Sequence, residues 1–435
     1  MRSDVHLVVG LALALGASAA ATTTAAGTGV GRAASVSPVG DPGHGQAPAQ
    51  RPYESYVADL SSTDPDVRAG AMRVLASSGY LEALVPLSAL LTDPVDDLQL
   101  ETIDQVLGFF AVDRPPSKRM VGGIIEVRSK AGSAQSLFDQ GPFVILPRRT
   151  PPELVAGLAG AARDQNPKVR LEGIYALGVV GQPPIDPVAA GALIGGLRDT
   201  QTEIRVAAAR VLGGLRVSQA GEALIEAVND TEHVVRAAAM RALGEIREPR
   251  AVQALTEQLR YYERGTLADA AFDGLARIGS PASIPLFNEQ LGSRNQLRRQ
   301  LAAEGLARCG EPQAAAGVAT ALSEERKTEV RLARAFAAEK AGQQGLDALV
   351  DGLASEKTEA QAMAYLVELG TPIAPRLGPS LQHPDARIRE RVAMTLGMIG
   401  GDQAVAALEP LRRDADTSVA RAAERAIARI RIRGE

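Results

Sequence analysis

Few side chains of this chain could do covalent or metal chemistry. It has one cysteine, Cys309, and four histidines, His6, His44, His233 and His383. A cysteine nucleophile usually has a neighbouring histidine or another cation that stabilises its thiolate, but no histidine is close to Cys309 in sequence. No H-x-x-x-H or His-Glu pair is present either, although such pairs are typical of helical metal sites. We therefore expect an inert thiol and no metal site.

Other motifs of catalysis and cofactor binding are missing from the sequence. It contains no GxxxxGK[ST] phosphate loop, no zinc-ligand spacing and no GxSxG nucleophile elbow. The run GTGVG at 27–31 has no predicted strand before it, so it does not indicate a nucleotide site. The prediction is a protein that has no catalytic residues and no cofactor, and that is not an enzyme.

The sequence does repeat one helical segment. "TEIRVAAARVLGGL" (202–215) and "EHVVRAAAMRALGEI" (232–246) both place an aliphatic residue before Arg and continue as a small-residue helix that contains Leu. Counted from the residue before that Arg, the same frame fits at origins 67, 99, 169, 204, 235, 267, 298, 330, 358, 388 and 419. Nine of the ten spacings lie between 28 and 35 residues, and the exception is the 70 residues from 99 to 169. A fixed period of this size is typical of a repeat architecture.

The frame predicts how each unit folds. Positions 0, 4, 8 and 11 lie on one face of a helix, and position 8 is usually Leu, as in Leu212 and Leu243. Cys309 occupies position 11, where other units carry Ile, Leu or Val, which predicts a core residue. A second amphipathic segment, such as "QAVAALEPLRR", separates successive frames. Position 12 is often glycine, which can end a helix in the left-handed conformation, as at Gly79, Gly181, Gly279, Gly310, Gly342, Gly370 and Gly400.

Each unit therefore reads as two antiparallel helices that can bury their apolar faces only against neighbouring units. The predicted fold class is all-α, an α-solenoid (superhelix) of about ten to eleven helix pairs with one non-repeat insertion.

The period, the loop Asp followed by aliphatic-Arg and the AxxxLG ending resemble HEAT-like repeats of the short bacterial type first named from phycobilisome lyases. This resemblance covers residues 56–432 apart from the insertion, and it implies an armadillo-type superhelix used for protein–protein interaction. Some HEAT-like proteins, the deoxyhypusine hydroxylases, hold iron through His-Glu pairs. Since this sequence has no such pair, the resemblance does not bring an iron site with it.

A recurring Asp and Arg predict a structural ladder. In three successive units the Asp precedes the Arg by six residues, as Asp164 and Arg170, Asp199 and Arg205, and Asp230 and Arg236. We expect each Asp to cap the start of a helix and to pair with an Arg of its own or a neighbouring unit. A basic binding ridge is the alternative interpretation.

The frame also predicts a candidate partner-binding ridge. Positions 3, 6 and 10 face away from the core stripe, and in HEAT-like arrays the second helix of each unit lines the concave side. Arginine, aromatic residues and methionine are typical of interfaces. The candidate residues are Arg73, Tyr175, Arg210, Arg241, Arg277, Arg308, Phe336 and Met394, with the apolar ones expected to be exposed. An ordinary solvated face is the competing interpretation.

The last predicted helix carries five arginines. They could contact a membrane or an acidic partner, but a polar helix that caps the array for solubility is the favoured interpretation. The five are Arg421, Arg425, Arg429, Arg431 and Arg433.

The N-terminus predicts export. Residues 1–19 combine a short polar start, an apolar run and Ala17-Ser18-Ala19, which fits the cleavage site of a signal peptide. Residues 20–50 are rich in Ala, Gly, Thr and Pro and read as a disordered linker. We expect a periplasmic or secreted protein whose mature chain has no transmembrane segment.

The long spacing indicates an insertion between two repeat blocks. The predicted organisation is N-terminal repeats at 51–111, an insertion at 112–150 that is partly extended, and C-terminal repeats at 151–435. "GGIIEVRS" and "GPFVIL" favour extended structure, and "GSAQSLFDQ" favours a helical turn or two. A degenerate full repeat is the alternative. The insertion is either functional, gripping a partner or plugging the groove, or structural.

Together these features predict an exported, non-enzymatic scaffold that holds a protein or peptide partner on its concave face. The alternative is an accessory or lyase-like factor that serves a modified protein. Nucleic-acid binding is disfavoured because the net charge is −4 and tryptophan is lacking.

Overall fold

The computed structural model describes residues 52–111 and 134–434. Over these residues the chain is helical, and its one β pairing is an isolated antiparallel bridge between Ala111 and Ile145. The helices stack in antiparallel pairs along a curved row, so the prediction of an all-α solenoid is confirmed. The predicted signal peptide (1–19) and linker (20–50) lie outside the described residues.

Most units consist of a first helix and a longer second helix. The first helices are α1 (Tyr53–Asp59), α3 (Leu84–Leu87), α6 (Pro152–Ala161), α8 (Pro187–Gly196), α10 (Gly221–Ala227), α12 (Val252–Tyr262), α14 (Ile284–Leu291), α16 (Pro312–Ala321), α18 (Leu346–Asp351) and α21 (Asp402–Leu408). The second helices are α2 (Pro65–Ser77), α4 (Asp96–Leu107), α7 (Pro167–Val180), α9 (Thr202–Gly214), α11 (His233–Glu245), α13 (Thr266–Ile278), α15 (Gln296–Arg308), α17 (Thr328–Lys340), α19 (Glu359–Leu369), α20 (Ala386–Ile399) and α22 (Thr417–Gly434).

Short 3-10 turns complete the units, and between α19 and α20 they take the place of a first helix. They are η1 (Leu81–Ala83), η2 (Ser88–Thr92), η3 (Pro142–Val144), η4 (Ser218–Ala220), η5 (Pro249–Ala251), η6 (Pro281–Ser283), η7 (Gly352–Ala354), η8 (Thr371–Ile373), η9 (Pro375–Gln382) and η10 (Glu409–Arg413).

The core is continuous from unit to unit. Leu212, Leu243, Leu275 and Leu306 occupy the same frame position on α9, α11, α13 and α15, and all four are fully buried. These helices contact one another in succession, so each leucine is enclosed by its own unit and its neighbours. Full burial of a leucine is worth about 1.5–3 kcal/mol, which explains why this position tolerates so little variation along the array.

In most units, the glycine predicted to end the second helix adopts the left-handed conformation. Gly79, Gly279, Gly310, Gly342, Gly370 and Gly400 have φ between 64° and 86°. The prediction is wrong for Gly181, whose φ is −65° because the chain continues in an extended conformation. After α9 and α11, the position of this glycine is occupied by Arg216 and Arg247, with φ of 53° and 54°. This left-handed conformation costs a non-glycine residue free energy.

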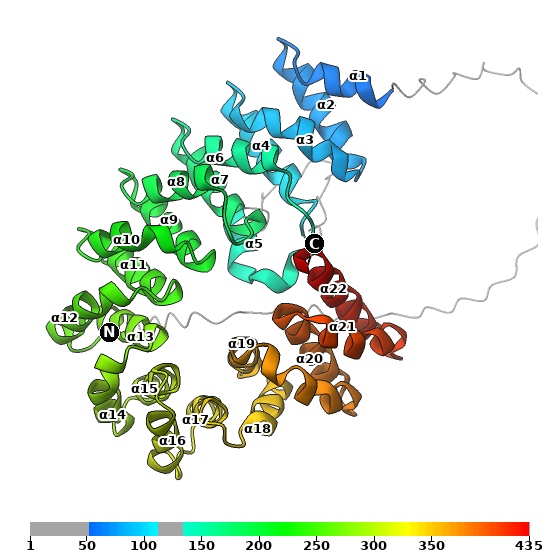
Figure 1. Cartoon of the computed structure of the whole chain (residues 1–435). Coiled ribbons are helices and arrows are strands. Elements are labelled where there is room, and N and C mark those ends of the chain that lie inside the picture. The colour runs from blue at the N-terminus through cyan, green and yellow to red at the C-terminus, as the bar shows by residue number, and fades with distance from the viewer. Residues whose placement is uncertain (1–51, 112–133, 435) are drawn as a thin grey trace, which may run out of the picture.

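The solenoid curves until its two halves meet. Figure 1 shows an arc with α8, α10, α12, α14 and α16 on its outer side and α9, α11, α13, α15 and α17 on its inner side. The last described helix, α22, returns to the segment after α5 (Ala134–Gln140). The contact is made by Arg429, whose Nη2 donates to the carbonyl oxygens of Pro142 at 2.8 Å and Ile145 at 2.9 Å.

The described part of the predicted insertion is α5, η3 and a non-helical stretch that leads to α6. The Ala134 N–H donates to Glu172 of α7 at 2.7 Å, and Phe138 lies against Gly178 of α7, where a Cβ would come within 2.7 Å of its ring. Residues 134–150 are therefore not a second helix pair, which counts against a degenerate full repeat. The "GGIIEVRS" stretch, expected to be extended, lies outside the described residues.

Candidate partner-binding surface

The recurring Asp and Arg link each unit to the next. Arg170 pairs with Asp199 at 2.7 Å and Arg205 pairs with Asp230 at 2.8 Å, and each guanidinium also donates to a loop carbonyl of its own unit. The same geometry recurs at Arg68–Asp93, Arg299–Glu325 and Arg389–Asp414. Each arginine thus fixes its own loop and the following loop, which makes these pairs part of the scaffold.

The aspartates do not cap the helices, and that part of the prediction is wrong. Asp164 accepts from the Asn166 N–H at 2.7 Å, and Asn166 is itself the capping residue of α7. The carboxylate therefore shapes the turn one step before the helix starts. Asp164 also accepts from Gln99 at 3.0 Å, because the unit before it presents a glutamine instead of the ladder arginine.

The ladder is incomplete at Arg236. Its guanidinium donates to the carbonyl oxygens of Asp230 and Thr231 and contacts His233, but it has no carboxylate partner among the described residues. Its Nε is buried without an acceptor. The loop after α12 supplies no acid at the position where Asp230 serves Arg205, so the ladder is interrupted here and resumes at Arg299.

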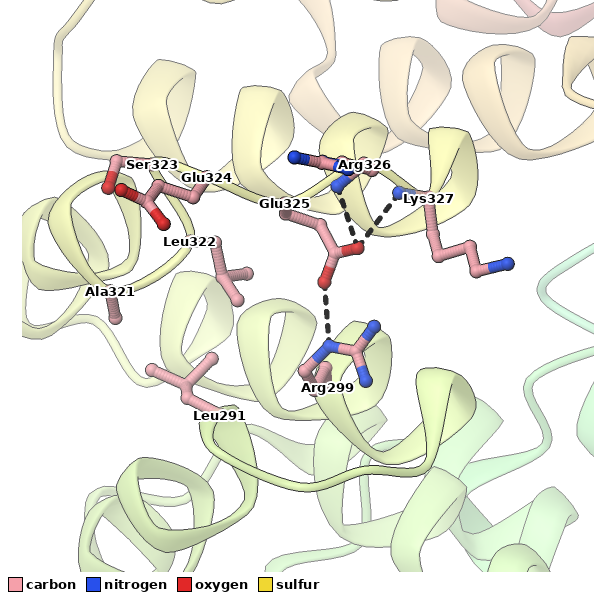
Figure 2. A pocket seen from close by; sticks show the side chains of 9 residues that line it. All are labelled: Leu291, Arg299, Ala321, Leu322, Ser323, Glu324, Glu325, Arg326 and Lys327. Carbon is pink, nitrogen blue, oxygen red and sulfur yellow. Dashed lines mark hydrogen bonds and ion pairs between the residues drawn. The ribbon is translucent and has the colours of Figure 1, made fainter.

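Two shallow pockets of about 450 Å³ each lie at the ladder. Figure 2 shows the first, where Glu325 accepts from Arg299 at 2.6 Å and from the backbone N–H groups of Arg326 and Lys327. The second surrounds Arg205 and Asp230 in the corresponding place. Because both pockets are built around satisfied ion pairs of the repeat, they do not indicate a separate ligand site.

The insertion already covers the first part of the predicted ridge. Tyr175 is only 2% exposed, because the Phe138 ring of α5 lies 5.5 Å from its own ring. Arg210 pairs with Asp139 of α5 at 2.5 Å and donates to the Tyr175 hydroxyl at 3.2 Å. The prediction that Tyr175 presents an exposed ring is therefore wrong.

Phe336 is also buried, and the prediction that it is exposed is wrong. It is 0% exposed and stacks on Tyr365 of α19 at 4.6 Å, with Arg308 and Lys340 beside the ring. Arg308 is held by Glu304 at 3.0 Å and Glu368 at 2.9 Å. Burial opposes the charged form of Glu368, but the hydrogen bonds from Arg308 keep the pKa of this carboxyl below its ordinary value.

Three further ridge residues keep some exposure but have partners. The Arg73 side chain is 59% exposed and pairs with Glu101 at 2.5 Å. Arg277 is 44% exposed and pairs with Asp273 on its own helix at 3.0 Å. Met394 is only half-buried, with the Arg391 guanidinium 3.9 Å from its sulfur.

Arg241 differs from the other arginines of the ridge. It lies on α11 between α9 and α13, is half-buried, and forms no hydrogen bond or ion pair with any described residue. Glu245, one turn further along α11, lies within electrostatic range of Arg277, Asp273, Arg216 and Arg210. Burial raises the pKa of Glu245. The inner surface at α11 therefore combines an unpaired arginine with a dense group of charges.

Cys309 is buried, with its thiol donating to the Gly305 carbonyl oxygen at 3.0 Å. Burial, together with the nearby Glu311, raises the pKa of this thiol to about 11. Within residues 52–111 and 134–434, no three His, Cys, Asp or Glu side chains come together as a metal site. The described helices include none that is both long and apolar enough to cross a membrane.

Sequence reasoning missed Asp139, Glu368 and the Tyr365–Glu304 hydrogen bond of 2.6 Å. A helix prediction for "AQSLFDQ" would have placed Phe138 and Asp139 next to each other. It could not have placed them over α7 and α9, because that contact depends on the path of the insertion.

Comparisons with known proteins agree with this fold. A family model of HEAT repeats matches residues 190–271 and 346–428. No curated protein matches the chain by sequence.

Several solved structures also show weak similarity to the chain. An engineered protein is 19% identical with a TM-score of 0.32, and the match covers 87% of this chain and 98% of that chain. The CpcE–CpcF complex of phycocyanin lyase from Nostoc sp. is 18% identical with a TM-score of 0.30, over 76% and 100% of the two chains. A chain from a study of cadherin and beta-catenin is 13% identical with a TM-score of 0.36, over 87% and 94%. In two stretches, 190–271 and 346–428, this all-α solenoid is thus similar in sequence to HEAT repeats.

Proposed function

We propose that this protein is an exported, non-enzymatic scaffold that holds a protein or peptide partner on the concave surface around α11. The observation that carries the proposal is Arg241, a half-buried arginine on the inner surface that has no acidic partner among the described residues. Arginine is enriched at the centres of protein interfaces, and a half-buried cation gains most when an incoming carboxylate pairs with it.

The position of Arg241 supports this proposal. To one side, Arg210 is neutralised by Asp139 of the insertion, and to the other, Arg277 is neutralised by Asp273. The surface left for a partner is therefore centred on α11. This surface is smaller than the ridge that the sequence predicts. Solenoids typically bind along such curved inner surfaces.

Export is the second element of the proposal, and it is supported by the apolar run and the Ala17-Ser18-Ala19 site of residues 1–19. The absence of catalysis is supported by the burial of Cys309.

The experiment is affinity capture from the periplasmic or secreted fraction, with crosslinking and mass spectrometry to identify what is held. The full chain is compared with Arg241→Glu and with Arg294→Glu, a matched control in an exposed loop. We expect one saturable partner whose recovery falls about tenfold with Arg241→Glu and stays unchanged with Arg294→Glu. Equal recovery by all three proteins would contradict the concave site, and a retained N-terminal run would contradict export.

A further inference from the structure

Three arginines of α22 form a separate charged feature. Arg425, Arg429 and Arg433 are spaced by four residues, so they follow one ridge of the helix. Both Arg425 and Arg433 are close enough to affect the ionisation of Arg429, which shows that the three charges form one group. Like charges at this spacing destabilise a helix, so the arrangement works against the stability of α22.

No acid offsets this group within the described residues. Arg429 donates to the carbonyl oxygens of Pro142 and Ile145, and Arg433 donates to the Met398 carbonyl oxygen at 2.9 Å. Arg425 has no hydrogen bond or ion pair with a described residue. On the same helix, by contrast, Arg431 pairs with Glu409 at 3.2 Å. Burial together with Arg433 and Arg425 lowers the pKa of Arg429 to about 10, as expected for positive charges without a counter-charge.

The group lies where the solenoid closes. Arg429 makes the contact between α22 and the segment that follows α5 (Figure 1). A ligand held there would touch both α22 and the segment that follows α5. The carbonyl oxygens of Pro142 and Ile145 satisfy only one nitrogen of Arg429, Nη2. No hydrogen bond to a described residue uses the remaining donors of this half-buried guanidinium group, so they can serve an anionic ligand.

The spacing fits one kind of anionic ligand best. Residues four apart on a helix rise by about 6 Å, and alternate residues of an extended peptide lie about 6.6–7 Å apart on one side. We infer that Arg425, Arg429 and Arg433 bind an extended acidic peptide segment that carries carboxylates at alternate positions. This inference rests on the proposed function, since it names the chemistry of a partner segment and adds a second contact to the one at Arg241.

The test uses the full chain and fluorescence anisotropy with a labelled Glu-Gly-Glu-Gly-Glu peptide at low salt. The comparison peptides are Glu-Glu-Glu-Gly-Gly, which has the same charge, and Gln-Gly-Gln-Gly-Gln. We expect saturable binding of the alternating peptide, binding of the clustered peptide that is about tenfold weaker, and no binding of the neutral one. Equal binding of the two acidic peptides would overturn the inference, and this arm needs no variant that could fail to fold.

Variants locate the site. The double variant Arg425→Gln with Arg433→Gln should bind the alternating peptide about tenfold more weakly, or worse. Arg431→Gln on the same helix should leave the affinity for this peptide unchanged. The assignment would be overturned if the double variant and Arg431→Gln lost the same affinity for the peptide, or if the double variant lost none. Retention of the protein by vesicles of phosphatidylserine in phosphatidylcholine, without peptide binding, would overturn it in favour of a lipid surface. If Arg241→Glu abolishes partner capture while no acidic peptide binds, the proposed function stands and this inference fails.

Discussion

Arg429 and Ile145 are 284 residues apart in sequence, yet the Arg429 Nη2 lies 2.9 Å from the Ile145 carbonyl oxygen. With the bond to Pro142, this contact joins α22 to the segment after α5 and closes the arc. The insertion therefore has a structural role at two places, since α5 also covers the inner faces of α7 and α9.

The first prediction concerns this closure. Arg429→Ala removes two charge-assisted hydrogen bonds, each worth about 1.5–3 kcal/mol. We expect faster amide hydrogen exchange in residues 134–146 and a larger maximum dimension in small-angle X-ray scattering. Arg431→Ala, which removes only an exposed ion pair with Glu409, is the control. Unchanged exchange in Arg429→Ala would show that the arc stays closed without this residue.

The second prediction concerns the docking of α5. A Cβ at Gly178 would lie 2.7 Å from the Phe138 ring, whereas a Cβ at Gly195 of α8 would meet nothing within 4 Å. Gly178→Ala should therefore lower the free energy of unfolding by about 1–3 kcal/mol. Gly195→Ala should raise it by up to about 1 kcal/mol through helix propensity. Urea unfolding followed by circular dichroism measures both, and a similar effect of the two substitutions would argue against close packing of Phe138 on α7.

The repeat period predicts contacts between neighbouring units and no others. It places Leu243 in the core and Arg205 opposite the next loop, because both features depend only on the preceding and following repeats. It does not place Tyr365 on Glu304, 61 residues away, because α19 reaches back past the neighbouring unit to α15. The Arg308–Glu368 pair, 60 residues apart, shows the same long reach.

The exposure of the ridge could not be predicted from the position of a residue in the frame. Frame position 6 faces away from the core stripe in every unit, so the sequence predicts that Tyr175 and Phe336 are exposed to solvent. Tyr175 is covered by the Phe138 ring of the insertion, and Phe336 by the Tyr365 ring of the next unit. Arg241 forms no pair with a described residue, although Glu368 of α19 reaches Arg247, two residues beyond α11, at 2.7 Å.

The third prediction concerns acid stability. The hydrogen bond from Arg389 is the main cause that lowers the pKa of Asp414 below its ordinary value of 3.8. Because the folded-state pKa is lower than the unfolded one, this pair stabilises the fold above about pH 4 and loses that effect as the pH falls through the folded pKa. A double-mutant cycle of Arg389→Gln and Asp414→Asn should give a coupling of about 0.5–3 kcal/mol at pH 7.

The same cycle at pH 3 should give a smaller coupling. The exposed pair Arg198–Glu226 is the control, and its coupling should stay within about 0–1 kcal/mol. A coupling for Arg389 and Asp414 that is near zero at pH 7, or that grows at pH 3, would contradict a stabilising ladder.

The fourth prediction concerns Cys309. Its pKa is raised to about 11 by burial and by Glu311, and only the thiolate reacts rapidly. We expect the native protein to react with iodoacetamide at pH 8 at least about a hundredfold more slowly than the urea-unfolded chain. Mass spectrometry gives the rate of modification. Comparable rates for the two states would mean that the thiol is accessible and reopen a chemical role for it.

The central claim, that the inner surface holds the partner, is tested most directly by site-specific photo-crosslinking. One photoactivatable residue replaces Arg277, which packs against Gly244 of α11 and is 44% exposed, and a second replaces Lys357, which is 71% exposed in the loop before α19. After capture and irradiation, the account predicts crosslinked partner from position 277 and little or none from position 357. Crosslinks mainly from position 357, or equal yields from both, would contradict binding on the concave surface.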